Sequence, residues 1–96
     1  MQKSRKNNRI FLKTKFSIIE YLKFNNVFIF PTNMQLKKAI WGILNGGIVF
    51  IIIFNKSKKP SPFQVDFINK IIDNGGIAFV AHSLEEVKFE LKDYFL

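Results

Sequence analysis

The amino-acid sequence predicts an α/β protein, a single small domain in which helices cover both faces of a mixed β-sheet. Three observations support this prediction. The chain has 96 residues, 48% of them hydrophobic and twelve of them Phe, which is enough for one core and too little for two. Helix-like and strand-like segments follow one another in the order α-β-β-β-α-β-α. The segment 48–54 is apolar at every position, so that strand needs cover on both faces.

The first helix is predicted over about residues 14–24 because apolar residues there recur at helical spacing. These residues are Leu12, Phe16, Ile18, Ile19 and Leu22. Residues 1–12 are expected to form a basic, flexible arm, and residues 13–96 the folded domain. The β-prone residues 27–30 predict the first strand, which Pro31 stops because proline cannot donate to a sheet ladder.

The next two strands are predicted to form a hairpin. Residues 39–44 and 48–54 are β-prone, and Asn45-Gly46-Gly47 joins them. Asn-Gly supplies the positive φ angles that a tight hairpin turn needs. The second arm is therefore expected at the centre of the sheet.

The second helix has signals at both ends. Ser61 is an N-cap residue, Pro62 suits the first helical position and Gln64 completes a capping box, while Gly75-Gly76 provides the stop. The predicted buried face consists of Gln64, Phe67, Ile68, Ile71 and Ile72.

The chain ends with a strand and a helix. Residues 77–81 predict a short buried strand. Ser83-Leu84-Glu85-Glu86 then predicts a second capping box, which opens a last helix with Leu84, Val87 and Leu91 facing inward.

Positive charge is concentrated in the first part of the chain. The formal net charge is +8; residues 1–59 carry twelve Lys or Arg and one acid, whereas residues 60–96 carry three Lys and six acids. A one-sided basic surface attracts phosphate backbones, anionic lipid headgroups or acidic proteins. Nucleic acid or a nucleoprotein is the expected partner; a Lys-rich coding bias that only aids solubility is the alternative.

The candidate binding residues form two groups. The alternative interpretation is that these lysines and arginines are only solvated surface residues. The N-terminal arm contributes Lys3, Arg5, Lys6, Arg9, Lys13 and Lys15. The flanks of the hairpin contribute Lys37, Lys38, Lys56, Lys58 and Lys59.

The composition excludes several kinds of protein. Without Cys there is no disulfide framework and no thiolate zinc site. The longest apolar run has seven residues, against roughly 20 for a membrane-spanning helix. The basic N-terminus lacks the apolar stretch of a secretory signal. A soluble cytoplasmic protein without membrane contact is therefore expected.

Several short motifs occur in the order found in one nuclease family. They are Glu20-Tyr21-Leu22-Lys23, Ile40-Trp41-Gly42, Gly46, Ser61-Pro62-Phe63-Gln64, Gly75-Gly76-Ile77-Ala78-Phe79-Val80 and Ser83-Leu84-Glu85-Glu86-Val87. Over about residues 12–92 the chain resembles the virus-type replication-repair (VRR-NUC) branch of the PD-(D/E)XK nuclease superfamily. The resemblance implies a small restriction-endonuclease-like core with the α-β-β-β-α-β-α order, and it allows a symmetric homodimer.

The chain departs from this family at the residues of the catalytic site. The resemblance places Ala39 at the metal-binding Asp, Ile52 at the Glu and Phe54 at the Lys of the site, with Phe11 and Pro31 at two further positions; Gln64 alone is retained. Mg²⁺ needs hard oxygen ligands to activate water, and no Asp or Glu occurs between Tyr21 and Val65, so no shift of alignment restores them. We expect neither a metal or other cofactor nor catalysis.

Five residues have both a functional and a structural interpretation. Glu20 and Asp66 are the acids nearest the lost site, but the helical pattern turns Asp66 outward. His82, the single histidine, is a potential base or a strand-end residue beside a helix cap. Trp41 would stack on bases or pack in the core. Gln64 itself would serve the site or only close the capping box.

Three functions remain open. The favoured one is a catalytically inactive nuclease-fold protein that binds nucleic acid or a nucleoprotein, in its most specific form a phage-type inhibitor that occupies an RNA-guided defence nuclease. The alternative is a replication or repair factor that recognises DNA or RNA. An enzyme with an unrecognised site, or one paired with an active subunit, is the third.

Overall fold

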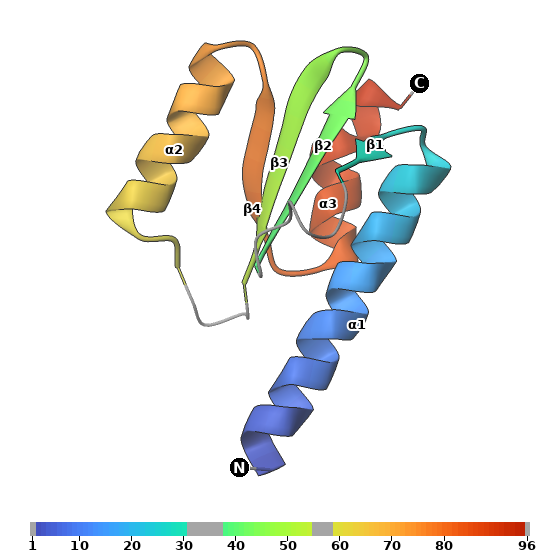
Figure 1. Cartoon of the computed structure of the whole chain (residues 1–96), viewed down its shortest axis with the longest axis vertical. Helices are drawn as coiled ribbons and strands as arrows, with labels where there is room; N and C mark the ends of the chain where they lie inside the picture. Colours follow the sequence, from blue (N-terminus) through green and yellow to red (C-terminus); the bar gives the residue numbers. More distant parts are fainter. Residues whose placement is uncertain (1, 31–37, 55–58, 96) are drawn as a thin grey trace.

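A computed structural model describes residues 2–30, 38–54 and 59–95, and the side chains of residues 12–30, 38–54 and 59–95 (Figure 1). The elements are α1 (Gln2–Phe24), β1 (Phe28–Ile29), β2 (Ala39–Leu44), β3 (Gly47–Ile53), α2 (Pro62–Asp73), β4 (Ile77–Ala81), α3 (Leu84–Leu91) and a final 3₁₀ turn η2 (Lys92–Tyr94). The predicted α-β-β-β-α-β-α order is confirmed.

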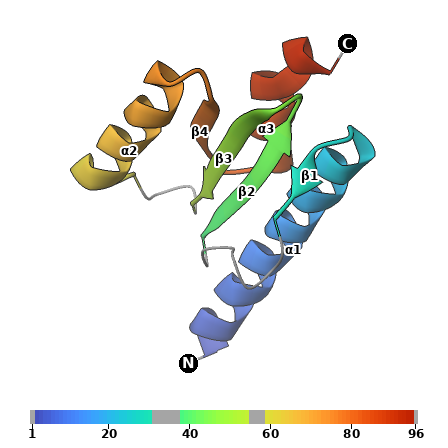
Figure 2. The same ribbon diagram turned by 45° about the horizontal axis from the view of Figure 1, so that its top comes forward.

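The four strands form one mixed sheet in the order β1-β2-β3-β4. β1 pairs with β2 and β2 with β3 in antiparallel fashion, whereas β4 pairs with β3 in parallel. Figure 2 shows β3 between β2 and β4. The central position predicted for this strand from its uninterrupted apolar run is therefore confirmed.

Helices cover both faces of the sheet, as predicted. Along β3, Ile51 and Ile53 face one core and Phe50 and Ile52 face the other, because successive side chains of a strand point to opposite faces. The first core contains Ile18 and Leu22 of α1 and Val87 and Leu91 of α3. The second core contains Ile68 of α2. Figure 1 shows α2 on one side of the sheet and α1 with α3 on the other.

The start predicted for the first helix is wrong. The helix begins at Gln2 rather than near residue 14, so the backbone of residues 2–12 is helical. Residues 2–13 contain neither Pro nor Gly, the two strong helix breakers. Apolar spacing marks only the part of a helix that packs on a core, which here begins at Ile18 among the described side chains. The flexibility expected of the arm stays a prediction.

The hairpin turn is confirmed. Asn45 and Gly46 both have positive φ, 52° and 84°, and Leu44 pairs with Gly47 across a two-residue loop, as in a type I′ turn. β3 consequently begins at Gly47, one residue before the predicted start. β1 is shorter than predicted, Phe28–Ile29, although the N–H of Phe30 also donates to the carbonyl of Trp41 (3.1 Å).

The capping box of α2 is confirmed. The Ser61 hydroxyl accepts the backbone N–H of Gln64 (3.2 Å), and the Gln64 side chain accepts the N–H of Ser61 (2.9 Å). The box predicted for α3 is only half formed. Ser83 accepts the N–H of Glu86, but the Glu86 carboxylate accepts the N–H of His82 and also contacts its ring.

The buried face predicted for α2 is partly wrong. Ile68 is buried and Gln64 and Ile71 are half-buried, but Phe67 and Ile72 are exposed. The backbone of α2 lies mainly along the edge strand β4, and Phe67 reaches Phe50 of β3 and Trp41 of β2 with its ring.

Candidate functional site

Three positions that the resemblance assigns to a nuclease site meet in one pocket. Ala39 and Ile52 are direct partners in the β2–β3 ladder, and Gln64 lies on the first turn of α2. All three line a cavity of about 400 Å³. We call it the aromatic pocket; its lining residues are Lys38, Ala39, Phe50, Ile52, Phe63, Gln64 and Phe67.

The aromatic pocket is apolar with two polar side chains. Among the described residues that line it, Lys38 is the one charged side chain and none is a carboxylate. Gln64 completes the capping box of α2 and also lines the pocket. Its predicted structural role is therefore confirmed, and a role in the site stays a prediction. The pocket is chemically suited to an apolar or aromatic group next to an anion.

Phe54, the third substituted position, lies in the core on the same face of the sheet as Ala39 and Ile52 and does not line the pocket. Its ring is 7% exposed and belongs to the same cluster as Ala39 and Ile52. Its N–H donates to the carbonyl of Ala81 (3.1 Å), which continues the pairing of β3 with β4 by one residue. An apolar ring at this position therefore supports the floor of the site.

Aromatic rings give the pocket one wall. Phe67 meets Phe50 edge to face at 5.2 Å between ring centroids and Trp41 at 5.7 Å, while Trp41 lies 4.2 Å from Phe50. The packing interpretation of Trp41 is thus confirmed. Phe63, one helical turn before Phe67, is 79% exposed. Phe63 and Phe67 were not predicted to belong to the site, although their i, i+4 spacing beside Gln64 was a usable signal.

Several of the candidate basic residues lie at one end of the molecule. Lys38 and Lys59 are exposed and stand just before β2 and just before α2. The carbonyl of Lys38 accepts the N–H of Ile53 (2.7 Å), which holds its backbone at the open end of the hairpin. Figure 1 shows the N-terminal half of α1 extending past the sheet at this same end. We call it the basic end.

Two lysines of the first candidate group, on α1, lie in different environments. Lys13 is exposed, whereas Lys15 is half-buried, and burial lowers the pKa of its amine below the ordinary value. Lys3, Arg5, Lys6 and Arg9 lie along α1. Lys37, Lys56, Lys58 and Pro31 lie outside the described residues.

The acids nearest in sequence do not line the aromatic pocket. Glu20 is exposed on α1. Asp66 is exposed on α2 and pairs with Lys70 at 3.1 Å, which confirms that it points outward. In the described parts of the chain, no group of three or more His, Asp or Glu is placed to share a metal ion.

His82 lies at the junction of β4 and α3, as expected of a strand-end histidine beside a helix cap. Its Nδ1 is 3.2 Å from Glu86 Oε1, and its backbone N–H donates to Glu86 Oε2 at 3.2 Å. These contacts tie the end of the strand to the first turn of α3.

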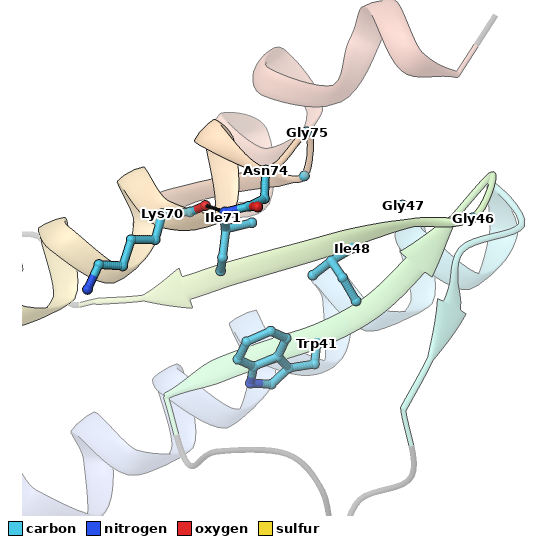
Figure 3. A pocket seen from close by; sticks show the side chains of 9 residues that line it. Trp41, Gly46, Gly47, Ile48, Lys70, Ile71, Asn74 and Gly75 are labelled. Carbon is cyan, nitrogen blue, oxygen red and sulfur yellow. Dashed lines mark hydrogen bonds between the residues drawn. The ribbon is translucent and has the colours of Figure 1, made fainter.

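A second cavity of about 420 Å³ lies between the hairpin turn and the end of α2 (Figure 3). Trp41, Gly46, Gly47, Ile48, Lys70, Ile71, Asn74, Gly75 and Gly76 line it. Its polar side chains serve their own helix: Asn74 donates to the carbonyl of Lys70 (2.8 Å), and Lys70 pairs with Asp66. It is a weaker candidate than the aromatic pocket.

None of the described helices combines the length and the apolar character that crossing a membrane requires. Comparisons of the chain with protein-family models, with curated proteins and with solved structures found no match.

Proposed function

We propose that this chain is a catalytically inactive protein of restriction-endonuclease-like fold that binds nucleic acid at its basic end. One observation carries the proposal. Ala39 and Ile52 are partners across the hairpin and Gln64 comes from α2; among the described residues, these three positions of the resemblance line one pocket with a lysine in its wall and no carboxylate.

The fold supports the proposal at a coarser level. The order of helices and strands agrees with the order that the resemblance implies, and the sheet is mixed with helices on both faces. The assignment to the PD-(D/E)XK superfamily rests on this order together with the convergence of the three positions.

Catalysis is not part of the proposal because the ligands for a metal are missing. Mg²⁺ is held by hard oxygen donors and lowers the pKa of the attacking water. Ala39 and Ile52 offer only hydrocarbon, and the outward-facing Asp66 is engaged by Lys70. Phe54 replaces the lysine that would stabilise charge on the phosphorus. The pocket therefore lacks the carboxylates and the lysine that a nuclease site of this family would use.

Binding is proposed for nucleic acid because the charge and its placement suit a phosphate backbone. Twelve of the fifteen basic residues lie in residues 1–59. Those whose side chains are described at the basic end include Lys13, Lys38 and Lys59, all exposed. Lysines neutralise phosphates and release counterions, which gives affinity without a reading of sequence.

In the most specific version of this proposal, the bound nucleic acid is the guide RNA of a host defence nuclease, and the chain is a phage-type inhibitor in the host cytoplasm. A protein that covers RNA without cutting it would block such an effector. The check is target cleavage by a purified RNA-guided effector with and without the chain; unchanged cleavage at saturating protein would remove this version and leave nucleic-acid binding standing.

The test of the proposed function compares two sets of three lysines. The variant K13Q/K38Q/K59Q removes three charges from the basic end, and the matched control K70Q/K88Q/K92Q removes three exposed charges from α2, α3 and η2. Binding of labelled DNA or RNA is measured against salt concentration. The basic-end variant is expected to lower the slope of log affinity against log salt by about 0.7–0.9 per lost phosphate contact.

The control is expected to keep the slope of the unmodified chain. Equal loss in both variants would mean that net charge alone attracts the nucleic acid. That result would contradict a binding site at the basic end.

A further inference from the structure

We propose that the aromatic pocket takes one unpaired nucleobase of the bound strand, stacked on Phe63, while Lys38 holds the adjoining phosphate. This inference rests on the proposed function, since the base belongs to the nucleic acid bound at the basic end. It adds the class of nucleic acid, single-stranded or locally unpaired, and the residues that select it.

The pocket has the form of a ligand site. Its volume of about 400 Å³ falls within the usual range for small-molecule sites, and its lining is mostly apolar with two polar side chains. Ala39, Phe50 and Ile52 close the bottom of the pocket and are each no more than 3% exposed, so its accessible surface comes mainly from Lys38, Phe63, Gln64 and Phe67. A ligand would rest on these more exposed side chains.

The rings on α2 suit a flat aromatic ligand. Phe63 and Phe67 are one helical turn apart on the same face of α2. Phe67 is held in place by its edge-to-face contacts with Phe50 and Trp41, whereas Phe63 is 79% exposed. An exposed ring over an apolar pocket gives a base a stacking surface, and every base has a π-face to stack.

The polar residues favour a nucleotide over a neutral apolar ligand. Lys38 is exposed and lines the pocket without a carboxylate in the lining to neutralise it. A phosphate next to the base supplies the missing negative charge. Gln64 uses its Oε1 to accept the N–H of Ser61, so its NH₂ group is the part left to donate to a base carbonyl.

The base must be unpaired because in a duplex its faces are already stacked and its edge is already paired. Single strands, loops and bulges present bases that are free to stack on aromatic side chains. Flipping a base out of an intact duplex requires unpairing and unstacking it, which disfavours paired substrates. The pocket would therefore discriminate by pairing state rather than by sequence.

The chain carries its own reporter for this test. Trp41 is the single tryptophan and contacts Phe50 and Phe67, which line the pocket. Trp41 fluorescence is followed during titration with a short oligothymidylate, with the same oligomer lacking its bases, and with a duplex of equal length. The oligothymidylate is expected to change the fluorescence, and the abasic and duplex forms are not.

Two variants locate the effect. F63A is expected to weaken binding of the oligothymidylate by about 5- to 150-fold, the range for loss of one stacking ring, and to leave duplex binding unchanged. F89A removes another exposed ring, on α3 and outside the aromatic pocket, and is expected to bind like the unmodified chain. Both rings are exposed, so neither variant removes core packing.

The outcomes separate this inference from the proposed function. Salt-dependent binding of all three ligands, with no fluorescence change and no effect of F63A, would overturn the base pocket and leave the proposed function intact. Failure to bind any nucleic acid at low salt would overturn both. A fluorescence change that depends on protein concentration alone would mean that a second copy covers the pocket, which also overturns the inference.

Discussion

The double variant A39D/I52E is expected to lose most of its stability in metal-free buffer at neutral pH and to regain part of it when Mn²⁺ is added. Ala39 and Ile52 are each 3% exposed and are direct partners on β2 and β3. Two carboxylates placed there would be desolvated and would repel each other, at a cost of several kcal/mol. A divalent cation between them supplies the missing charge and stabilises the folded state by binding it.

The measurement is the thermal unfolding midpoint with and without Mn²⁺. The control A39N/I52Q has similar shape and no charge, so it is expected to be destabilised less and to respond weakly to the metal. If Mn²⁺ raises the midpoint of A39D/I52E no more than that of the control, these positions do not form the metal site that the resemblance assigns. The alignment of β2 and β3 with the nuclease family would then be wrong.

Replacing Ile51 by alanine is expected to lower the free energy of unfolding by about 2–5 kcal/mol, the range for large-to-small changes in a core. Ile51 is 0% exposed on the central strand β3, paired with Ile40 on one side and Phe79 on the other. A cavity there affects the packing of the sheet against α1 and α3. For a domain with a total stability of about 5–15 kcal/mol, this is a large fraction.

The same substitution at Ile72 is the matched control. Ile72 lies on α2 and is 49% exposed, so I72A is expected to change stability by about 0.5 kcal/mol or less. Urea unfolding followed by Trp41 fluorescence measures both variants. Similar losses for I51A and I72A would contradict the assignment of Ile51 to the core beneath the sheet.

Local signals predicted most of the fold. The Asn45-Gly46 turn, the capping box at Ser61 and the bounds of β2 and β4 agree with the structure because each depends on a few neighbouring residues. The length of α1 was not predicted correctly, because the helix continues into a polar segment where no apolar spacing indicates a helix. The predicted β1 is longer than the strand in the structure, because the extent of β1 depends on its pairing with β2 and not on its own composition.

The site was less predictable than the fold. Ala39, Ile52 and Gln64 were named through the resemblance, and nothing in their own chemistry indicates that they meet. The walls of the aromatic pocket were missed because apolar spacing placed Phe67 on the buried face of α2. The packing of that helix along β4 sets where Phe67 and Phe63 lie over the sheet. The i, i+4 spacing of the two rings indicates that they share a face of the helix, but the position of the helix over the sheet is a tertiary property.

The most direct test of the central claim is a titration of the purified chain against labelled RNA and DNA in the presence of Mg²⁺ or Mn²⁺. Native gels report binding and denaturing gels report cutting, each at low and at high salt. We predict retarded, intact nucleic acid at low salt and steep weakening as the salt concentration rises. Metal-dependent fragments would contradict the inactive site, and the absence of any retardation at low salt would contradict nucleic-acid binding.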